Sequence, residues 1–167
     1  MKLYLSANIR AKLKEIVYAT KVETGACLFG TKDREGNFQV AHLAGPGKRA
    51  KHLSWHYEGD HEHYENVYNE LLKSDGNLKH LGELHVHPPG MPELSRGDLR
   101  TVKKVLKRYE EFIAGVILRK RTPDLRRAML GLAGSRLYEK GLREMSIYPV
   151  YFSREKPEGE NLELVIE

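Results

Sequence analysis

Apolar side chains recur at helical spacing in three stretches of the chain. In each stretch they stand three and four positions apart, which places them on one face of a helix. Ser6 or Asn8, Asp60 and Ser95 stand at the starts of these stretches, and all are residue types that cap helices. The apolar positions are Ile9, Leu13, Ile16 and Val17 in the first, Tyr64, Val67, Tyr68, Leu71 and Leu72 in the second, and Leu99, Val102, Leu106 and Tyr109 in the third.

Shorter runs, rich in β-branched and aromatic residues, predict strands between these helices. The expected strands are Ala26–Phe29, Phe38–Leu43, 79–87, Phe112–Leu118, about Ala128–Leu132 and Met145–Phe152. The first two form a hairpin across a polar turn, and the stretch 45–60 is expected to be a loop that carries Trp55. The alternation of helices and strands predicts an α/β fold, a mixed β-sheet covered by helices.

The length of 167 residues fits a single domain, expected to span residues 1–152. Residues 153–161 are polar enough to form a loose tail. The apolar residues between Leu162 and Ile166 either add an edge strand to the same domain or dock on a partner. A single cysteine and the absence of any window of about 20 apolar residues indicate a cytoplasmic protein with no membrane span.

The formal charge of +5 is a modest excess that does not by itself identify a partner. Much of it lies in 103–108 and in the segment 119–127. A solvated helix face and a basic loop are the first interpretation of these segments, and a substrate-binding rim is the second. No aromatic residues interleave with the cations of 119–127, which argues against a nucleic-acid partner.

Two histidines in the strand over 79–87 give the sequence its candidate chemistry. His85 and His87 are two positions apart, so a strand projects both rings from one face. Asp98 follows a Pro/Gly loop and falls in the first turn of the third helix. Two imidazoles and one carboxylate match a catalytic zinc site, in which three protein ligands leave the fourth position for water. We therefore predict one Zn²⁺ held by these three side chains.

Simpler interpretations exist for each residue taken alone. Ser95 and Asp98 have the spacing of a capping box, and a lone histidine in a strand is more often half-buried than a ligand. The presence of all four residues together favours the metal site. A second cluster, formed by His52, His56, His61 and His63, is disfavoured because His61 and His63 would point apart on a helix.

The pattern His85-x-His87-Pro88, six residues, Ser95-x-x-Asp98 resembles the metal motif of the JAMM (MPN-plus) metalloproteases. Glu23, placed before the Gly-rich segment 25–30, resembles the upstream glutamate of that family. The surrounding sequence, from about Glu23 to Leu118, is similar to that of short, stand-alone bacterial members associated with ubiquitin-like conjugation and antiphage operons. One departure is Val86, where relatives often carry Ser or Thr.

The resemblance implies a cytidine-deaminase-like fold and cleavage of peptide or isopeptide bonds after ubiquitin-like proteins. It also implies E1- or E2-like enzymes as further partners. It implies Glu23 as the general base and Ser95 as the donor to the developing oxyanion. Glu83 is a rival base that shares a face with the histidines, and its expected role is support of a ligand. Trp55 and Met91 are candidate walls of the substrate cleft.

Two alternatives to this peptidase stay open. One is another zinc hydrolase or a deaminase on the same fold, although the paired cysteine ligands of nucleobase deaminases are absent. The other is a non-catalytic module that binds a ubiquitin-like protein. Such a module is expected to have a broken ligand set, and the set in this sequence is complete.

Overall fold

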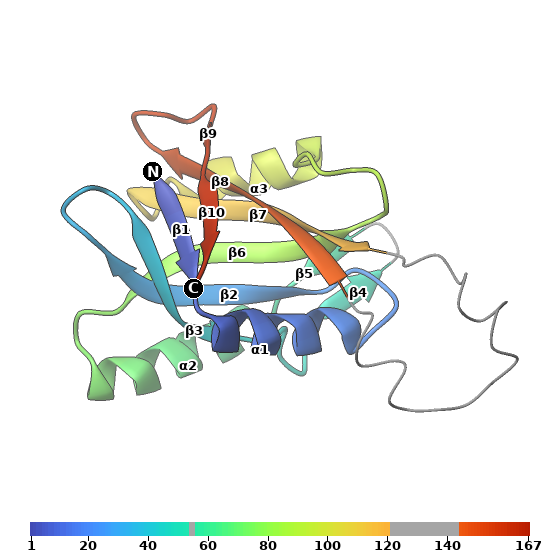
Figure 1. Ribbon diagram of the computed structural model, residues 1–167, viewed down its shortest axis with the longest axis horizontal. Helices are drawn as coiled ribbons and strands as arrows, with labels where there is room; N and C mark the ends of the chain where they lie inside the picture. The colour runs from blue at the N-terminus through green and yellow to red at the C-terminus, as the bar shows by residue number, and fades with distance from the viewer. Residues whose placement is uncertain (54–55, 121–143) are drawn as a thin grey trace, which may run out of the picture.

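A computed structural model describes residues 1–53, 56–120 and 144–167, and within them it has one large mixed sheet (Figure 1). The strand order is β10-β1-β3-β2-β6-β7-β8-β9. β1 pairs parallel with β3 and β10, β6 pairs parallel with β7, and the other pairs are antiparallel. The strands are β1 (Lys2–Leu5), β2 (Gly25–Lys32), β3 (Phe38–Ala44), β6 (Lys79–His87), β7 (Glu111–Lys120), β8 (Glu144–Ser153), β9 (Glu160–Asn161) and β10 (Glu163–Ile166).

Three helices accompany the sheet, and each begins where the sequence predicts. They are α1 (Ala7–Tyr18), α2 (His61–Ser74) and α3 (Arg96–Val105), capped by the side chains of Ser6, Asp60 and Ser95. The third helix ends at Val105 rather than near Tyr109. The chain turns at that point and Tyr109 is exposed, although its spacing continues the apolar stripe. The α/β class predicted from the sequence is confirmed.

Alternation along the strands assigns the helices to the two faces of the sheet. On β2, Ala26 and Leu28 pack in the core cluster that contains α1, whereas Cys27 and Phe29 pack in the cluster beneath α2. On β7, the isoleucines face the α1 cluster, and Phe112 and Ala114 pack under α3. The sheet therefore lies between α1 on one face and the pair α2 and α3 on the other.

Several strands were not expected from the sequence. The stretch 45–60, predicted as a loop, contains the two-stranded sheet of β4 (Lys51–Leu53) and β5 (His56–Glu58). β1 was also not expected, because four residues give too short a pattern. β10 pairs in parallel with it, so of the two alternatives for the C-terminal apolar residues the structure has the edge strand. The prediction of a loose tail over 153–161 was wrong, because a turn joins the end of β8 to β9, which pairs with β8. The expected strand Ala128–Leu132 and Trp55 lie outside the described residues.

An irregularity in β6 reverses the direction of its side chains. The register with β2 shifts between Leu28 and Phe29, opposite Gly82, so β6 carries one extra residue there. Gly82 has a φ of 154°, and a Cβ atom at this position would lie 1.9 Å from the carbonyl oxygen of Ile113. Only glycine fits at this bulge.

His80, which precedes the bulge, is enclosed by aromatic rings on the α2 and α3 side of the sheet. The ring centroids of Phe29, Tyr109 and Phe112 lie 5.8, 5.4 and 5.7 Å from that of His80. Its Nδ1 atom is buried and has no hydrogen-bond partner. Burial, assisted by the charge of His61, lowers the pKa of His80 to about 4.

We expect His80 to make the protein less stable in mild acid. The unfolded chain takes up a proton near pH 6.5 and the folded chain only near pH 4, so stability falls as the pH falls through this interval, by at most about 3 kcal/mol. His80→Phe should flatten the curve of unfolding free energy against pH in denaturant titrations. His42→Phe, at an exposed position of β3, is the matched control. An unchanged slope in His80→Phe would contradict this assignment.

Among the described residues, no helix is long and apolar enough to cross a membrane.

Candidate metal centre

The side chains of Glu83, His85 and His87 lie on the α2 and α3 side of β6. Leu84 and Val86, which alternate with them, are buried in the core cluster on the α1 side. His87 is 7% exposed and His85 is partly exposed. The two histidines thus project from the same face, as the spacing predicts, and they do so at the C-terminal end of the strand.

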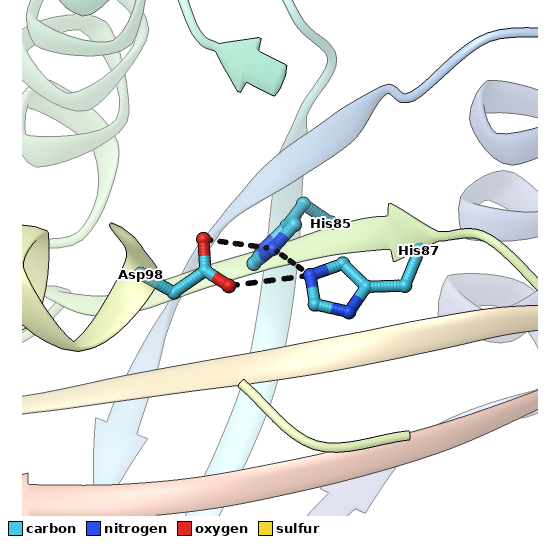
Figure 2. A group of neighbouring side chains, drawn as sticks. All are labelled: His85, His87 and Asp98. Atoms are coloured by element: carbon cyan, nitrogen blue, oxygen red, sulfur yellow. Dashed lines mark hydrogen bonds and ion pairs between the residues drawn. The ribbon is translucent and has the colours of Figure 1, made fainter. Parts of the chain in front are cut away.

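Asp98 of α3 completes a compact group with these histidines, shown in Figure 2. The two Nε2 atoms are 2.8 Å apart, and Asp98 Oδ1 lies 3.4 Å from His85 Nε2 and Asp98 Oδ2 lies 3.2 Å from His87 Nε2. Ligands of a tetrahedral zinc ion are roughly 3.3 Å from one another when the metal bonds are about 2.0–2.1 Å long. The three donors therefore have nearly the spacing that one small cation requires.

The start of α3 fixes the orientation of the Asp98 carboxylate. Ser95 N donates a hydrogen bond of 2.7 Å to Asp98 Oδ2, and Asp98 N donates one of 3.2 Å to Ser95 Oγ. These two bonds form a capping box, with Asp98 at its third helical position. Helix capping and ligation were competing interpretations of this pair, but the structure makes them compatible. The cap holds the carboxylate where it faces both imidazoles.

The His87 ring is oriented from its other side by the loop after β6. Its Nδ1 lies 3.1 Å from the carbonyl oxygen of Met91. Because a carbonyl only accepts hydrogen bonds, Nδ1 carries a proton, which leaves Nε2 as the nitrogen that a metal ion could bind. Histidines that bind metals in proteins usually have such a second partner.

Electrostatics at the site favour a bound cation. Burial opposes ionisation of Asp98, but hydrogen bonds from His85 and His87 outweigh it and hold the pKa of Asp98 far below its ordinary value. Burial also opposes a charged His87, yet Asp98, the Met91 carbonyl and the charge of Glu23 together raise the pKa of His87. The surroundings thus stabilise positive charge at the position of the imidazoles.

In the described part of the chain, these three side chains are the only group of three or more His, Cys, Asp or Glu residues whose ligand atoms lie this close together. The second histidine cluster, considered for residues 52–63, does not form a site among the described side chains. The donor set, its spacing and its charge all fit a metal, so the group of His85, His87 and Asp98 could hold a metal ion.

Glu23 lies beside His87. Gly25 pairs with His85 in the antiparallel ladder, and Val86 N donates a hydrogen bond of 2.7 Å to the carbonyl of Thr24. Extending the same register by one residue would place Glu23 opposite His87 and on the same face of the sheet. Its charge contributes to the raised pKa of His87, and Glu23 is 9% exposed. A buried carboxylate therefore lies close enough to the candidate ligands for its charge to act on His87.

Two residues that the sequence analysis missed hold the segment around Glu23. His52 Nδ1, on β4, lies 2.9 Å from the carbonyl oxygen of Glu23. The guanidinium of Arg119 donates to the carbonyls of Val17, Lys21 and Val22 at 3.0, 2.9 and 2.9 Å. Interpreting Arg119 as part of a basic loop was wrong, because β7 extends to Lys120. The remainder of that segment, 121–127, lies outside the described residues.

We expect Arg119→Leu to lower the unfolding free energy by about 2–4 kcal/mol, since three charge-assisted hydrogen bonds are lost. Arg119→Lys should recover less than half of this loss, because an ammonium group cannot span three carbonyls. Urea titration would measure both. Arg34→Leu, at an exposed position in the β2–β3 turn, should change stability by less than about 0.5 kcal/mol. Similar losses in the two leucine variants would contradict the role of Arg119.

Glu83 belongs to a row of hydrogen-bonded polar side chains beneath α2. The Tyr57 and Tyr64 hydroxyl oxygens are 2.6 Å apart, and Tyr64 hydrogen-bonds to Glu83. Burial raises the pKa of Glu83 to about 7, against the opposing effects of His85 and of Tyr64. Gly25 makes room for this row, because a Cβ there would lie 2.5 Å from the Tyr57 ring. Glu83 does share a face with the histidines, as expected.

Ser95 and Met91 lie at the rim of the site. Both are exposed, and Met91 is 46% exposed while its backbone binds His87. Trp55, the other candidate wall, cannot be placed because it lies outside the described residues. The rim is thus formed at least by the loop between β6 and α3.

Comparisons with known proteins support the fold alone. No model of a protein family matches the chain, and no curated protein matches it. The solution structure of protein DSY2949 from Desulfitobacterium hafniense has a TM-score of 0.63 at 14% identity, covering 99% of this chain and 92% of that one. The solution structure of a Salinibacter ruber protein has a TM-score of 0.56 at 16% identity, covering 100% and 92%.

Proposed function

We propose that this chain is a zinc-dependent peptidase or isopeptidase of the JAMM type, which cleaves after the C-terminus of a ubiquitin-like protein. The observation that carries the proposal is the convergence of His85, His87 and Asp98, and the charge of buried Glu23 acts on His87. Motif residues from three separate segments meet at one place. The cytidine-deaminase-like fold implied by the motif belongs to the same proposal, and the mixed sheet between helices is compatible with it.

The residues divide the chemistry between them. Zn²⁺, when bound, lowers the pKa of a coordinated water from ~15.7 toward ~7 and so supplies a nucleophile at neutral pH. Glu23 accepts the proton of the attacking water and passes it to the leaving amine, a task suited to a carboxylate within hydrogen-bonding reach. Ser95 Oγ accepts the amide hydrogen of Asp98, so its own hydroxyl hydrogen is available to the substrate oxygen.

The substrate in this proposal is the extended C-terminal segment of a ubiquitin-like protein, joined to a lysine or to further residues. An extended segment can add to the edge of a sheet through its backbone. Met91 is exposed beside His87 and would contact the residues next to the cut. E1- and E2-like enzymes would make the conjugates on which the protein acts.

Incubation with ubiquitin-like conjugates tests this function directly. We expect cleavage after the ubiquitin-like C-terminus, loss of cleavage with 1,10-phenanthroline, and recovery when Zn²⁺ is added in excess of the chelator. Zinc bound at one per chain without any cleavage would favour a binding module or a hydrolase for another substrate. A protein that binds no zinc would overturn the metal centre itself.

A further inference from the structure

The outer face of α3 carries a row of cations that begins next to the metal centre. Arg96, Arg100 and Lys103 stand four and three positions apart, and Lys107 follows four positions later in the turn after the helix. This spacing aligns them along one side, over roughly 16 Å at 1.5 Å per residue. All four are exposed. We call this row the α3 basic face.

No described residue neutralises this face. Asp98 is the only acidic residue within α3, and its carboxylate turns toward the imidazoles. None of the four cations forms an ion pair with any residue in the described ranges 1–53, 56–120 and 144–167. Glu93 and Glu110, the nearest acidic residues in the sequence, precede and follow the row. The face therefore presents positive charge to the solvent.

Helix stability does not explain the arrangement. Like charges three and four positions apart destabilise a helix by about 0.2–0.5 kcal/mol per pair. The helix dipole favours lysine in the last turn, but it disfavours a cation at the first position, which Arg96 occupies. Solvation alone does not require charges of one sign, because a mixture of acidic and basic side chains would keep this face of α3 equally well hydrated.

Two exposed apolar side chains belong to the segments that carry the candidate metal centre. Leu99 is 37% exposed and directly follows Asp98, and Met91 is 46% exposed in the loop that binds His87. These are two of the large apolar side chains that the described surface leaves open. A ligand on this surface would meet apolar groups and Arg96 near the candidate metal centre, and the other three cations farther along α3 and in the turn after it.

We propose that the α3 basic face binds an acidic surface on the folded body of the protein whose C-terminal segment enters the metal centre. The identity of that partner as substrate rests on the proposed function, whereas its acidic character rests on the charge of α3. Charge complementarity of this kind steers encounter and selects partners. The apolar pair beside the metal and the absence of aromatic residues within α3 favour a protein over a nucleic acid, whose bases stack on aromatic rings.

A binding experiment tests the charge preference without requiring hydrolysis. The probes are a fluorescein-labelled peptide of ten glutamates and a labelled dT10 oligonucleotide, followed by fluorescence anisotropy in low salt. The variant Arg100→Glu/Lys103→Glu is compared with the control Lys12→Glu/Arg34→Glu, which changes the net charge equally at exposed positions of α1 and the β2–β3 turn. We expect about tenfold weaker glutamate binding in the α3 variant and less than twofold in the control.

Equal losses in both variants would overturn the proposal, because the effect would then come from net charge alone. So would an absence of glutamate binding, or tighter α3-dependent binding of dT10, which would indicate a nucleic-acid surface. Backbone amide shifts on adding the peptide should cluster in 96–107 of the wild-type protein.

A cleavage assay links the face to the substrate. With a ubiquitin-like substrate that the wild type cleaves, the α3 variant should show an about tenfold higher KM and an unchanged kcat. A short peptide that contains only the cleavage site should be cleaved equally by both. If glutamate binding depends on α3 but no cleavage occurs, the proposed function fails while the acidic preference of the face stands. An unchanged KM with the folded substrate would overturn the docking role.

Discussion

His87→Ala should weaken Zn²⁺ binding by more than about 100-fold, because loss of a direct ligand costs more than the 10–100-fold typical of its outer partners. His87 is the best choice for this test, since its ring is nearly buried and the Met91 carbonyl already orients it. Competition with a chromophoric chelator measures the affinity, and metal analysis measures the content per chain. Hydrolysis should fall below detection together with the metal.

His42→Ala is the matched control, because His42 is exposed on β3 and outside the cluster. Asp98→Asn should also lose the metal, and it should in addition weaken the capping box that starts α3. If His87→Ala kept one tightly bound zinc per chain, the ion would have to lie elsewhere. The three-residue centre would then be wrong.

Glu23→Gln should separate metal binding from catalysis. The amide has nearly the same shape as the carboxylate but cannot accept the proton of the attacking water, so we expect kcat to fall by about 10²–10⁴-fold. Zinc affinity should change little, because Glu23 is not one of the three candidate ligands. Steady-state kinetics on a ubiquitin-like conjugate, with zinc content measured on the same sample, gives both values.

Glu83→Gln is the control for that experiment. Glu83 lies on the same face of β6 and hydrogen-bonds to Tyr64, but the motif resemblance assigns the base to Glu23. We expect the Glu83 variant to retain measurable activity. The reverse result, with Glu83→Gln inactive and Glu23→Gln active, would exchange the two roles.

The directions of the His85 and His87 side chains and the place of Asp98 at the start of α3 could be predicted from the sequence because they depend on local patterns. Alternation along a strand sets the direction of His85 and His87, and a capping residue sets the start of α3 and so the position of Asp98. The expected strand over 79–87 has the observed bounds of Lys79–His87. Only the convergence of Asp98 on the histidines needed the fold.

The position of Glu23 depended on information that local patterns do not contain. It depends on the antiparallel register of β2 with β6, which only the structure supplies. Arg119 was misread for the same reason, because its partners Val17, Lys21 and Val22 are about a hundred residues away in the sequence. The pairing of β1 with β10 joins the two ends of the chain. A short stretch of sequence contains no information about such a contact.

The bulge at Gly82 shifts the alternation of side chains between the two faces of the sheet by one residue along β6. Before it, even-numbered His80 faces α2 and α3; after it, odd-numbered His85 and His87 do. Length changes in this strand are therefore not equivalent. Removing the extra residue at the bulge could be absorbed by straightening the strand, whereas removing one residue between Gly82 and His85 would turn both imidazoles into the hydrocarbon packed beneath α1.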